Sequence, residues 1–244
     1  VYYIGNLEMA KVSKEEITFY NLDGEEIQKK MKTVDWDAEA AEKAGFEHFM
    51  MKEIHEQPRA VKDTLNSVLK DGKIDLTDIG LAEEDIRRTS QIYIVACGSA
   101  YHVGMVAQYV IEDLVKIPVR VELASEFRYR KPILDPNGLV IIISQSGETA
   151  DSLAALRETK AQGIRTLGIV NVVGSSIARE ADKVFYTLAG PEISVATTKA
   201  YSTQLMASYI LAIQFAKVKN TITEEQYENY IAELQAIPEK IEKI

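Results

Sequence analysis

The chain has 244 residues, 46% of them hydrophobic and 27% charged, which is enough for one large globular domain or for one domain and part of a second. A net charge of −9, with no extended basic stretch and no apolar run long enough to cross a bilayer, argues against nucleic acid and membrane as partners. The single cysteine, Cys97, excludes an internal disulfide, which is typical of a cytoplasmic protein. The three histidines lack metal-ligand spacing, so we expect no bound metal, and we expect no cofactor.

Residues 1–34 carry short β-type runs, VYYI, MAKV and EEITFYNLDGEEI, and Asp23-Gly24 is a strong hairpin signal. So few residues cannot enclose a core of their own. We therefore expect the last hairpin of a preceding domain, followed by a polar connector over 35–45 that contains Trp36. Since Val1 already stands in a strand-like pattern, we expect the chain to be a piece of a longer protein.

From Phe46 the pattern becomes helical. Apolar residues recur at helical spacing through Phe49, Met50, Ile54, Val61, Leu65 and Leu69. Pro58 must start a second helix or kink the first, and Asp71-Gly72-Lys73 predicts the end of the helical segment.

Strands and helices then alternate. The strands are expected at 91–98, 119–123, 139–144, 165–171 and 183–188, and the helices at 99–115, 149–162 and 199–218. Near-continuous Val, Ile and Leu is typical of strands covered on both faces, as in parallel sheets. The pattern predicts an α/β fold with a doubly wound, five-stranded parallel sheet, and residues 223–244 add an amphipathic helix.

Three loops at the predicted carboxyl edge of this sheet have unusual compositions: Cys97–Ala100, Ser144–Thr149 and Ser194–Lys199. Ligands of open parallel sheets bind beyond this edge, near the point where the strand order reverses. In the middle loop, Gly147 permits a tight turn directly before a helix whose first amides are free.

Those amides, with Gln145 and the hydroxyls of Ser144, Ser146 and Thr149, are expected to cradle an anion, and phosphate is the anion that we predict. Neither GxxxxGK[ST] nor GxGxxG is present, so this is a different kind of phosphate loop. The alternative is that these hydroxyls only cap a helix and fill a turn.

Other polar residues near this edge have two interpretations each. Ser99 and Thr197 are either helix caps or ligand contacts. Cys97 is either a nucleophile or, as we expect from its place after an apolar strand, a buried inert thiol. Glu148 is either a base or a complement to the helix dipole, and Lys199 faces either an acid or solvent.

The segments ACGSAYHVG, ELASEFRYRKP, ISQSGETADSLAALR and PEISVATTKAYSTQ together resemble the first sugar isomerase (SIS) domain of the glutamine–fructose-6-phosphate aminotransferase family. The resemblance places this αβα sandwich at 46–222 and makes 223–244 a helix leading to a second SIS domain. The hairpin at 1–34 and the stretch KEIHEQP at 52–58 are similar to the end of that family's glutaminase domain and to its connector.

The family makes glucosamine 6-phosphate and glutamate from fructose 6-phosphate and glutamine. The resemblance implies that Ser144, Gln145, Ser146 and Thr149 hold the sugar phosphate. It also implies that the sugar contacts Ser99, the backbone of Val195 and the side chain of Thr197, and that the protein forms a homodimer.

The family's glutaminase cysteine, its general base and the lysine that opens the sugar ring all belong to parts outside this chain, and a partner subunit supplies a histidine. The resemblance therefore implies binding without catalysis in this chain. The sequence departs from the family pattern at Ser99, Ala100, Ser194 and Thr197, where Thr, Ser, Gly and Ser are the residues expected. Two alternatives stay open: a SIS sugar-phosphate sensor of a transcription regulator, and another SIS sugar isomerase or deglycase.

Overall fold

In a computed structural model of the chain, residues 1–31, 33 and 42–244 are described. The chain divides into two compact units, Val1–Asp37 and Ala38–Ile244. Most of the connector predicted over 35–45, including Trp36, lies outside the described residues. No described helix combines the length and the apolarity needed to cross a bilayer.

The first unit contains three antiparallel strands in the order β1-β2-β3, namely β1 (Met9–Val12), β2 (Ile17–Tyr20) and β3 (Glu26–Ile27). The predicted hairpin turn lies between β2 and β3, where Gly24 has a φ of 77°. Only Phe19 is buried among the described residues of this unit, which is too little to form a core. The expected strand at VYYI is wrong: the structure assigns these residues to no strand, and the Tyr2 ring packs against Phe19.

The helical segment after Phe46 forms α1 (Phe49–His55) and α2 (Gln57–Asn66), and Pro58 lies in the first turn of α2 as predicted. The helix does not extend to Leu69, because Leu69 lies in β4 (Leu69–Lys70) and pairs with Ile74 in β5 (Lys73–Ile74). Asp71 and Gly72 turn this small hairpin with φ values of 50° and 74°, which a helix cannot accommodate.

Five parallel strands form the main sheet, in the order β10-β9-β8-β6-β7. They are β6 (Ile92–Ala96), β7 (Val119–Leu123), β8 (Leu139–Ser144), β9 (Arg165–Val170) and β10 (Lys183–Tyr186). Every residue of β6 and β8 is buried, as the continuous apolar runs indicate. The predicted doubly wound, five-stranded parallel sheet is confirmed.

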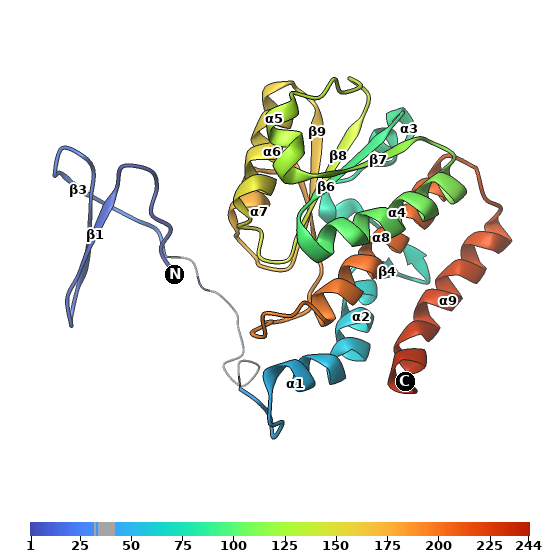
Figure 1. Ribbon diagram of the computed structural model, residues 1–244, viewed down its shortest axis with the longest axis horizontal. Coiled ribbons are helices and arrows are strands. Elements are labelled where there is room, and N and C mark those ends of the chain that lie inside the picture. Colours follow the sequence, from blue (N-terminus) through green and yellow to red (C-terminus); the bar gives the residue numbers. More distant parts are fainter. Residues whose placement is uncertain (32, 34–41) are drawn as a thin grey trace. The chain divides into compact units, whose positions relative to one another are not determined.

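Helices cover both faces of the sheet (Figure 1). One face packs on α4 (Gly98–Val115) and α8 (Lys199–Val218) through inward residues such as Ile94 and Ile141. The other packs on α6 (Ala150–Ala161) through the alternate residues, such as Val95 and Ile142. Two hydrophobic cores therefore sandwich one sheet.

Three short helices were not predicted: α3 (Glu83–Arg88), α5 (Ala124–Arg130) and α7 (Ser176–Glu180). The last helix, α9 (Glu224–Glu242), begins with a capping box in which Thr223 accepts from the Gln226 amide. A short 3₁₀ turn, η2 (Thr77–Ile79), completes the described elements.

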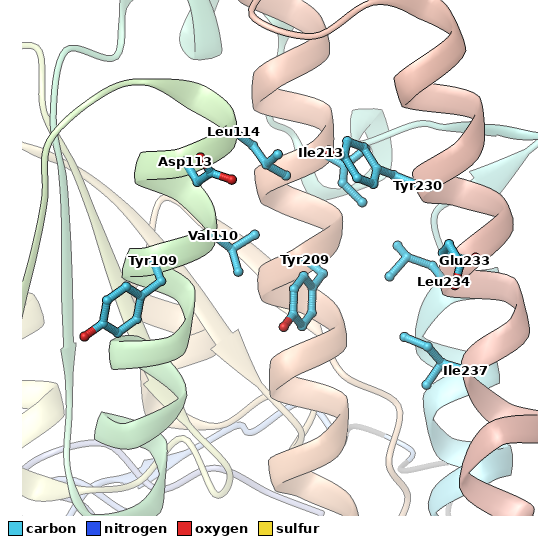
Figure 2. A pocket seen from close by; sticks show the side chains of 10 residues that line it. All are labelled: Tyr109, Val110, Asp113, Leu114, Tyr209, Ile213, Tyr230, Glu233, Leu234 and Ile237. Carbon is cyan, nitrogen blue, oxygen red and sulfur yellow. The ribbon is translucent and has the colours of Figure 1, made fainter.

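An apolar groove of about 580 Å³ runs between α4, α8 and α9 (Figure 2). Val110 and Leu114 of α4, Ile213 of α8, and Leu234 and Ile237 of α9 line it. Because α9 contributes one wall, the predicted amphipathic helix turns an apolar face toward the SIS-like core rather than standing free.

The edge strand β10 is fixed by Asp182, which accepts hydrogen bonds from the Thr166 amide (2.9 Å), the Thr166 hydroxyl (2.8 Å) and Lys160 Nζ (2.8 Å). Burial by itself raises the pKa of Asp182, but the bonds from Lys160 and Thr166 outweigh it and hold the pKa below its ordinary value of 3.8. A carboxylate with a depressed pKa stabilises the fold above its unfolded pKa, and this stabilisation is lost as the pH falls through the lower folded value.

We expect Asp182→Asn to lower the free energy of unfolding by about 1 kcal/mol at pH 7, since the group is partly exposed and solvent screens it. In urea titrations, the difference from the unmodified chain should shrink below pH 4. Asp113→Asn, which removes an exposed surface pair with Lys116, is the control and should change little. A difference for Asp182→Asn that is the same at pH 7 and pH 3 would contradict the role assigned to its charge.

Candidate functional site

The strand order reverses between β6 and β8. From β6 the chain passes to β7 at one edge of the sheet, then returns to β8 on the other side of β6. As a result α4, which follows β6, and α6, which follows β8, lie on opposite faces (Figure 1). The loops that start these two helices separate at the carboxyl edge of the sheet and leave room for a ligand.

A cavity of about 240 Å³ lies at this point. Its lining consists of Cys97, Gly98, Ser99, Ala100, Ile143, Ser144, Gln145, Ser146, Thr149, Thr197 and Gln204. The structure thus brings together every predicted site residue except Val195, whose side chain is fully exposed. Gln204 is an addition that the sequence did not suggest.

Hydrogen bonds within the loop hold its hydroxyls in place. The buried Ser144 Oγ lies 2.9 Å from Thr149 Oγ1 and accepts from the Gly147 amide at 3.1 Å. The Ser146 hydroxyl accepts from the Glu148 amide at 3.2 Å. These bonds fix the positions of the loop hydroxyls, which lowers the ordering cost of binding a ligand there.

Position 147 has no room for a side chain, so it requires glycine. Its φ is 66°, and a Cβ built on it would lie 2.0 Å from Ser175 Oγ. Its carbonyl accepts from the Ile177 amide at 3.0 Å, and the Gln145 carbonyl accepts from the Asn171 amide at 3.1 Å. The loop is thereby tied to the segment that follows β9.

The amino terminus of α6 faces this loop. Thr149 is its N-cap, and within the described chain the Thr149 side chain makes no capping bond. The first amides of a 12-residue helix are thus available to an anion, and the helix dipole favours negative charge there. Asp151 in this first turn is paired with Arg128 Nη1 at 2.6 Å, which offsets its charge.

The two candidate reactive groups, Glu148 and Cys97, lie in different surroundings. Glu148 Oε1 accepts from the Ser176 amide at 2.7 Å, so its carboxylate joins the loop to α7. Cys97 is only partly buried and lines the cavity, which corrects the expectation of a buried thiol. It lies at the N-cap of α4, where the chain has already left the sheet, and its sulfur contacts Ser152 Oγ at 3.9 Å.

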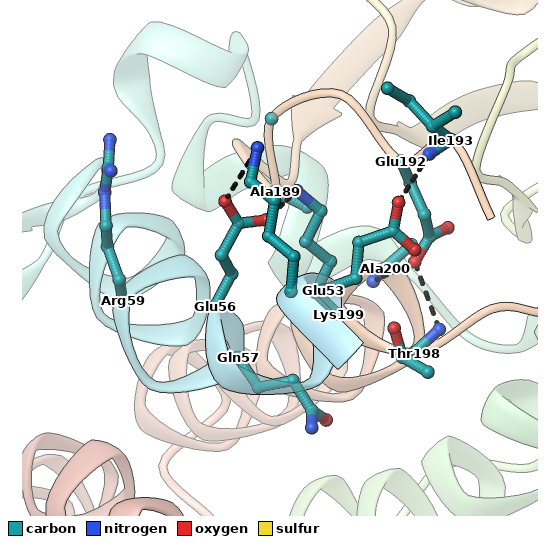
Figure 3. A network of polar contacts seen from close by, with 12 residues as sticks. Glu53, Glu56, Gln57, Arg59, Ala189, Glu192, Ile193, Thr198, Lys199 and Ala200 are labelled. Atoms are coloured by element: carbon teal, nitrogen blue, oxygen red, sulfur yellow. Dashed lines mark hydrogen bonds and ion pairs between the residues drawn. The ribbon is translucent and has the colours of Figure 1, made fainter. Parts of the chain in front are cut away.

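A buried carboxylate on α1 anchors the loop that carries Val195 and Thr197. Glu53, 1% exposed, accepts from the Ile193 amide at 2.6 Å (Figure 3). It also accepts from the Ser194 amide at 3.0 Å and from the Ser194 hydroxyl. The sequence missed it, because Met50 and Ile54 predicted an apolar inner face for α1. In the structure both are exposed, and Lys52 and Glu53 are buried instead.

A second carboxylate, Glu192, caps α8 by accepting from the amides of Thr198 (3.0 Å) and Ala200 (3.1 Å) (Figure 3). Burial raises the pKa of Glu192, although these two bonds act in the opposite direction. The Thr198 side chain lies at the N-cap of α8 but makes no capping bond within the described chain. Lys199 faces an acid: its Nζ lies 2.7 Å from Glu56 Oε2, and it is 2% exposed.

Comparison with known proteins gives similarity over the whole chain. The SIS domain model matches residues 85–214. The chain is 54% identical to a glutamine–fructose-6-phosphate aminotransferase (isomerizing) of Clostridium acetobutylicum and 43% identical to one of Methanosarcina acetivorans, in both cases across 100% of this chain and 40% of the relative. Among solved structures, the C-terminal domain of glucosamine-fructose-6-phosphate aminotransferase from Francisella tularensis matches with a TM-score of 0.78 and 47% identity, over 81% of this chain and 56% of that chain. The chain thus spans two-fifths of the length of these curated relatives.

Glu53→Ala removes the carboxylate that anchors the loop carrying Val195 and Thr197. The amides of Ile193 and Ser194 should then lose their hydrogen-bond acceptor. A hydrogen bond to a charged group contributes about 1.5–3 kcal/mol, so these amides should exchange with solvent about 10-fold faster or more. Hydrogen exchange followed by NMR measures this, with the amides of Ile141 and Ile142 in β8 as an internal reference. Glu47→Ala, at an exposed position before α1, is the matched control. Unchanged exchange at Ile193 and Ser194, or equal acceleration in β8, would contradict a local anchoring role.

Proposed function

The chain belongs to the SIS domain family, and from this premise we propose that its cavity binds fructose 6-phosphate. We propose further that the chain is the sugar-phosphate-binding part of the isomerase half of a glutamine–fructose-6-phosphate aminotransferase. Such an enzyme converts fructose 6-phosphate and glutamine to glucosamine 6-phosphate and glutamate. Relatives at 43–54% identity that bear this name support the aminotransferase over a regulator's sensor or another SIS isomerase.

The observation that carries the proposal is the loop from Ser144 to Thr149, where three hydroxyls and the open amino terminus of α6 meet at one cavity. These donors are neutral, and no Lys or Arg lines the cavity in the described chain. A phosphate dianion suits them, because several hydrogen bonds to a charged acceptor and the helix dipole act together.

Beyond the phosphate, Ser99 and Thr197 offer hydroxyls to the sugar, and the backbone of Val195 is proposed as a further contact. Ala100 lines the cavity where the family pattern has a serine, so only its backbone is polar there. The Glu53 anchor and the Glu192 cap support this part of the proposal, since they fix the segment on either side of Val195.

We propose that the groups that catalyse the isomerisation belong to other parts of the protein. Among the lining residues that the structure describes there is no carboxylate, histidine or lysine, and isomerisation needs a base within hydrogen-bond reach of the reacting carbons. The proposal therefore gives this chain binding without turnover. Conversion of fructose 6-phosphate to glucose 6-phosphate by the purified 244-residue chain would contradict it.

The domain assignment is also a proposal. Residues 1–34 would be the end of a glutaminase domain, 35–45 a connector, 46–222 the first SIS domain and 223–244 a helix leading to a second. The match of the curated relatives across the entire chain, including its first unit, supports this division. A cytoplasmic location and a homodimer are proposed on the single cysteine and on the family resemblance.

Thr149→Ala should weaken fructose 6-phosphate binding about 10- to 100-fold, because it removes one hydrogen bond to a charged group. Thr149→Ser keeps the hydroxyl and should bind nearly as the unmodified chain does. Isothermal titration calorimetry measures both. Binding of unphosphorylated fructose should be weak and unaffected by either change. An equal loss for fructose and fructose 6-phosphate would count against a phosphate role for this loop.

A further inference from the structure

Gln204, on the second turn of α8, has a buried side-chain oxygen that accepts no hydrogen bond from the described part of the chain. Its side chain is 1% exposed and lines the cavity beside Thr197. Its Oε1 has no hydrogen-bond partner among the described residues. Buried polar atoms in folded proteins are nearly always paired, so an unpaired one requires a reason.

Another glutamine of α8, Gln214, has a side-chain oxygen that does accept a hydrogen bond within the fold. Gln214 Oε1 accepts a hydrogen bond from the Tyr227 hydroxyl at 3.2 Å, and that hydroxyl accepts from the Ile74 amide at 2.9 Å. Gln214 thus links α8 to α9 and to the small β4–β5 hairpin. Among the described residues Gln204 Oε1 makes no such link, and an apolar side chain of similar size would avoid leaving a buried acceptor unpaired.

The place of Gln204 in the cavity limits what can pair with it. It comes from α8 on one face of the sheet, whereas the hydroxyl loop leads into α6 on the other face. An amide oxygen accepts hydrogen bonds, and a phosphate dianion has no proton to donate. A sugar hydroxyl does, and about 240 Å³ exceeds the roughly 30 Å³ share of one water molecule several times over.

From this geometry we infer that Gln204 is a sugar-contacting residue, whose Oε1 accepts a hydrogen bond from a hydroxyl of the bound sugar phosphate. The inference rests on the proposed function and adds a specificity contact to it. The Gln204 oxygen is then a binding group whose hydrogen-bond partner comes from the sugar, at some cost to the stability of the fold.

The test compares Gln204→Met with the matched control Gln214→Met in the 244-residue chain. Calorimetry gives the affinities for fructose 6-phosphate and for inorganic phosphate, and thermal unfolding gives Tm. For Gln204→Met we expect fructose 6-phosphate affinity to fall about 3- to 10-fold, as for one neutral hydrogen bond. Inorganic phosphate affinity should not change, and Tm should stay level or rise. For Gln214→Met we expect a lower Tm and unchanged affinities.

Two results would overturn the inference. Unchanged fructose 6-phosphate affinity in Gln204→Met would show that the amide does not contact the sugar. A lower Tm, or a parallel loss of inorganic phosphate binding, would show that Gln204 is structural. Either result leaves the proposed function intact if Thr149→Ala still weakens binding. Failure of the unmodified chain to bind fructose 6-phosphate would refute the proposed function itself, and with it this inference.

Discussion

The reversal of strand order between β6 and β8 determines where a ligand can bind in this fold. Because the chain leaves these adjacent strands toward opposite faces, the first turns of α4 and α6 diverge at the carboxyl edge between them. The cavity, the free amides of α6 and the hydroxyl loop all follow from this one feature of the topology.

Different interactions hold the three segments that meet at the cavity. The loop after β8 is held by its own hydroxyls and by the close approach of Gly147 to Ser175. The segment before α8 is held by carboxylates that accept from backbone amides, Glu53 at Ser194 and Glu192 at Thr198. A buried charge stabilises a structure only when it is well paired, so this second arrangement depends on every partner being present. Glu53 on α1 and Glu56, which lies between α1 and α2, support the site although neither lines the cavity.

The sequence predicts those features that depend on neighbouring residues. Strand β8 and the loop behind it are recognisable because five apolar residues precede a glycine flanked by hydroxyls. Features that depend on partners far away in the sequence cannot be predicted from the sequence alone. Glu53 reads as a solvent-facing residue of an amphipathic helix, since its partners lie about 140 residues further along the chain. Gln204 likewise reads as a polar interruption in a buried helix, because nothing local shows that it borders a cavity. Leu69 continues a helical apolar period, and only the positive φ values at Asp71 and Gly72 explain why it belongs to a hairpin.

The central claim is that the loop from Ser144 to Thr149 and the first turn of α6 hold the phosphate of a sugar phosphate. A crystal structure of the chain grown with fructose 6-phosphate tests it most directly, because the phosphorus atom is easily located in electron density. The account predicts phosphate oxygens within hydrogen-bond distance of Ser144, Ser146 and Thr149 and of the amides that begin α6, with the sugar extending toward Thr197 and Gln204. A phosphate bound anywhere else on the chain, with this loop left empty, would contradict the account.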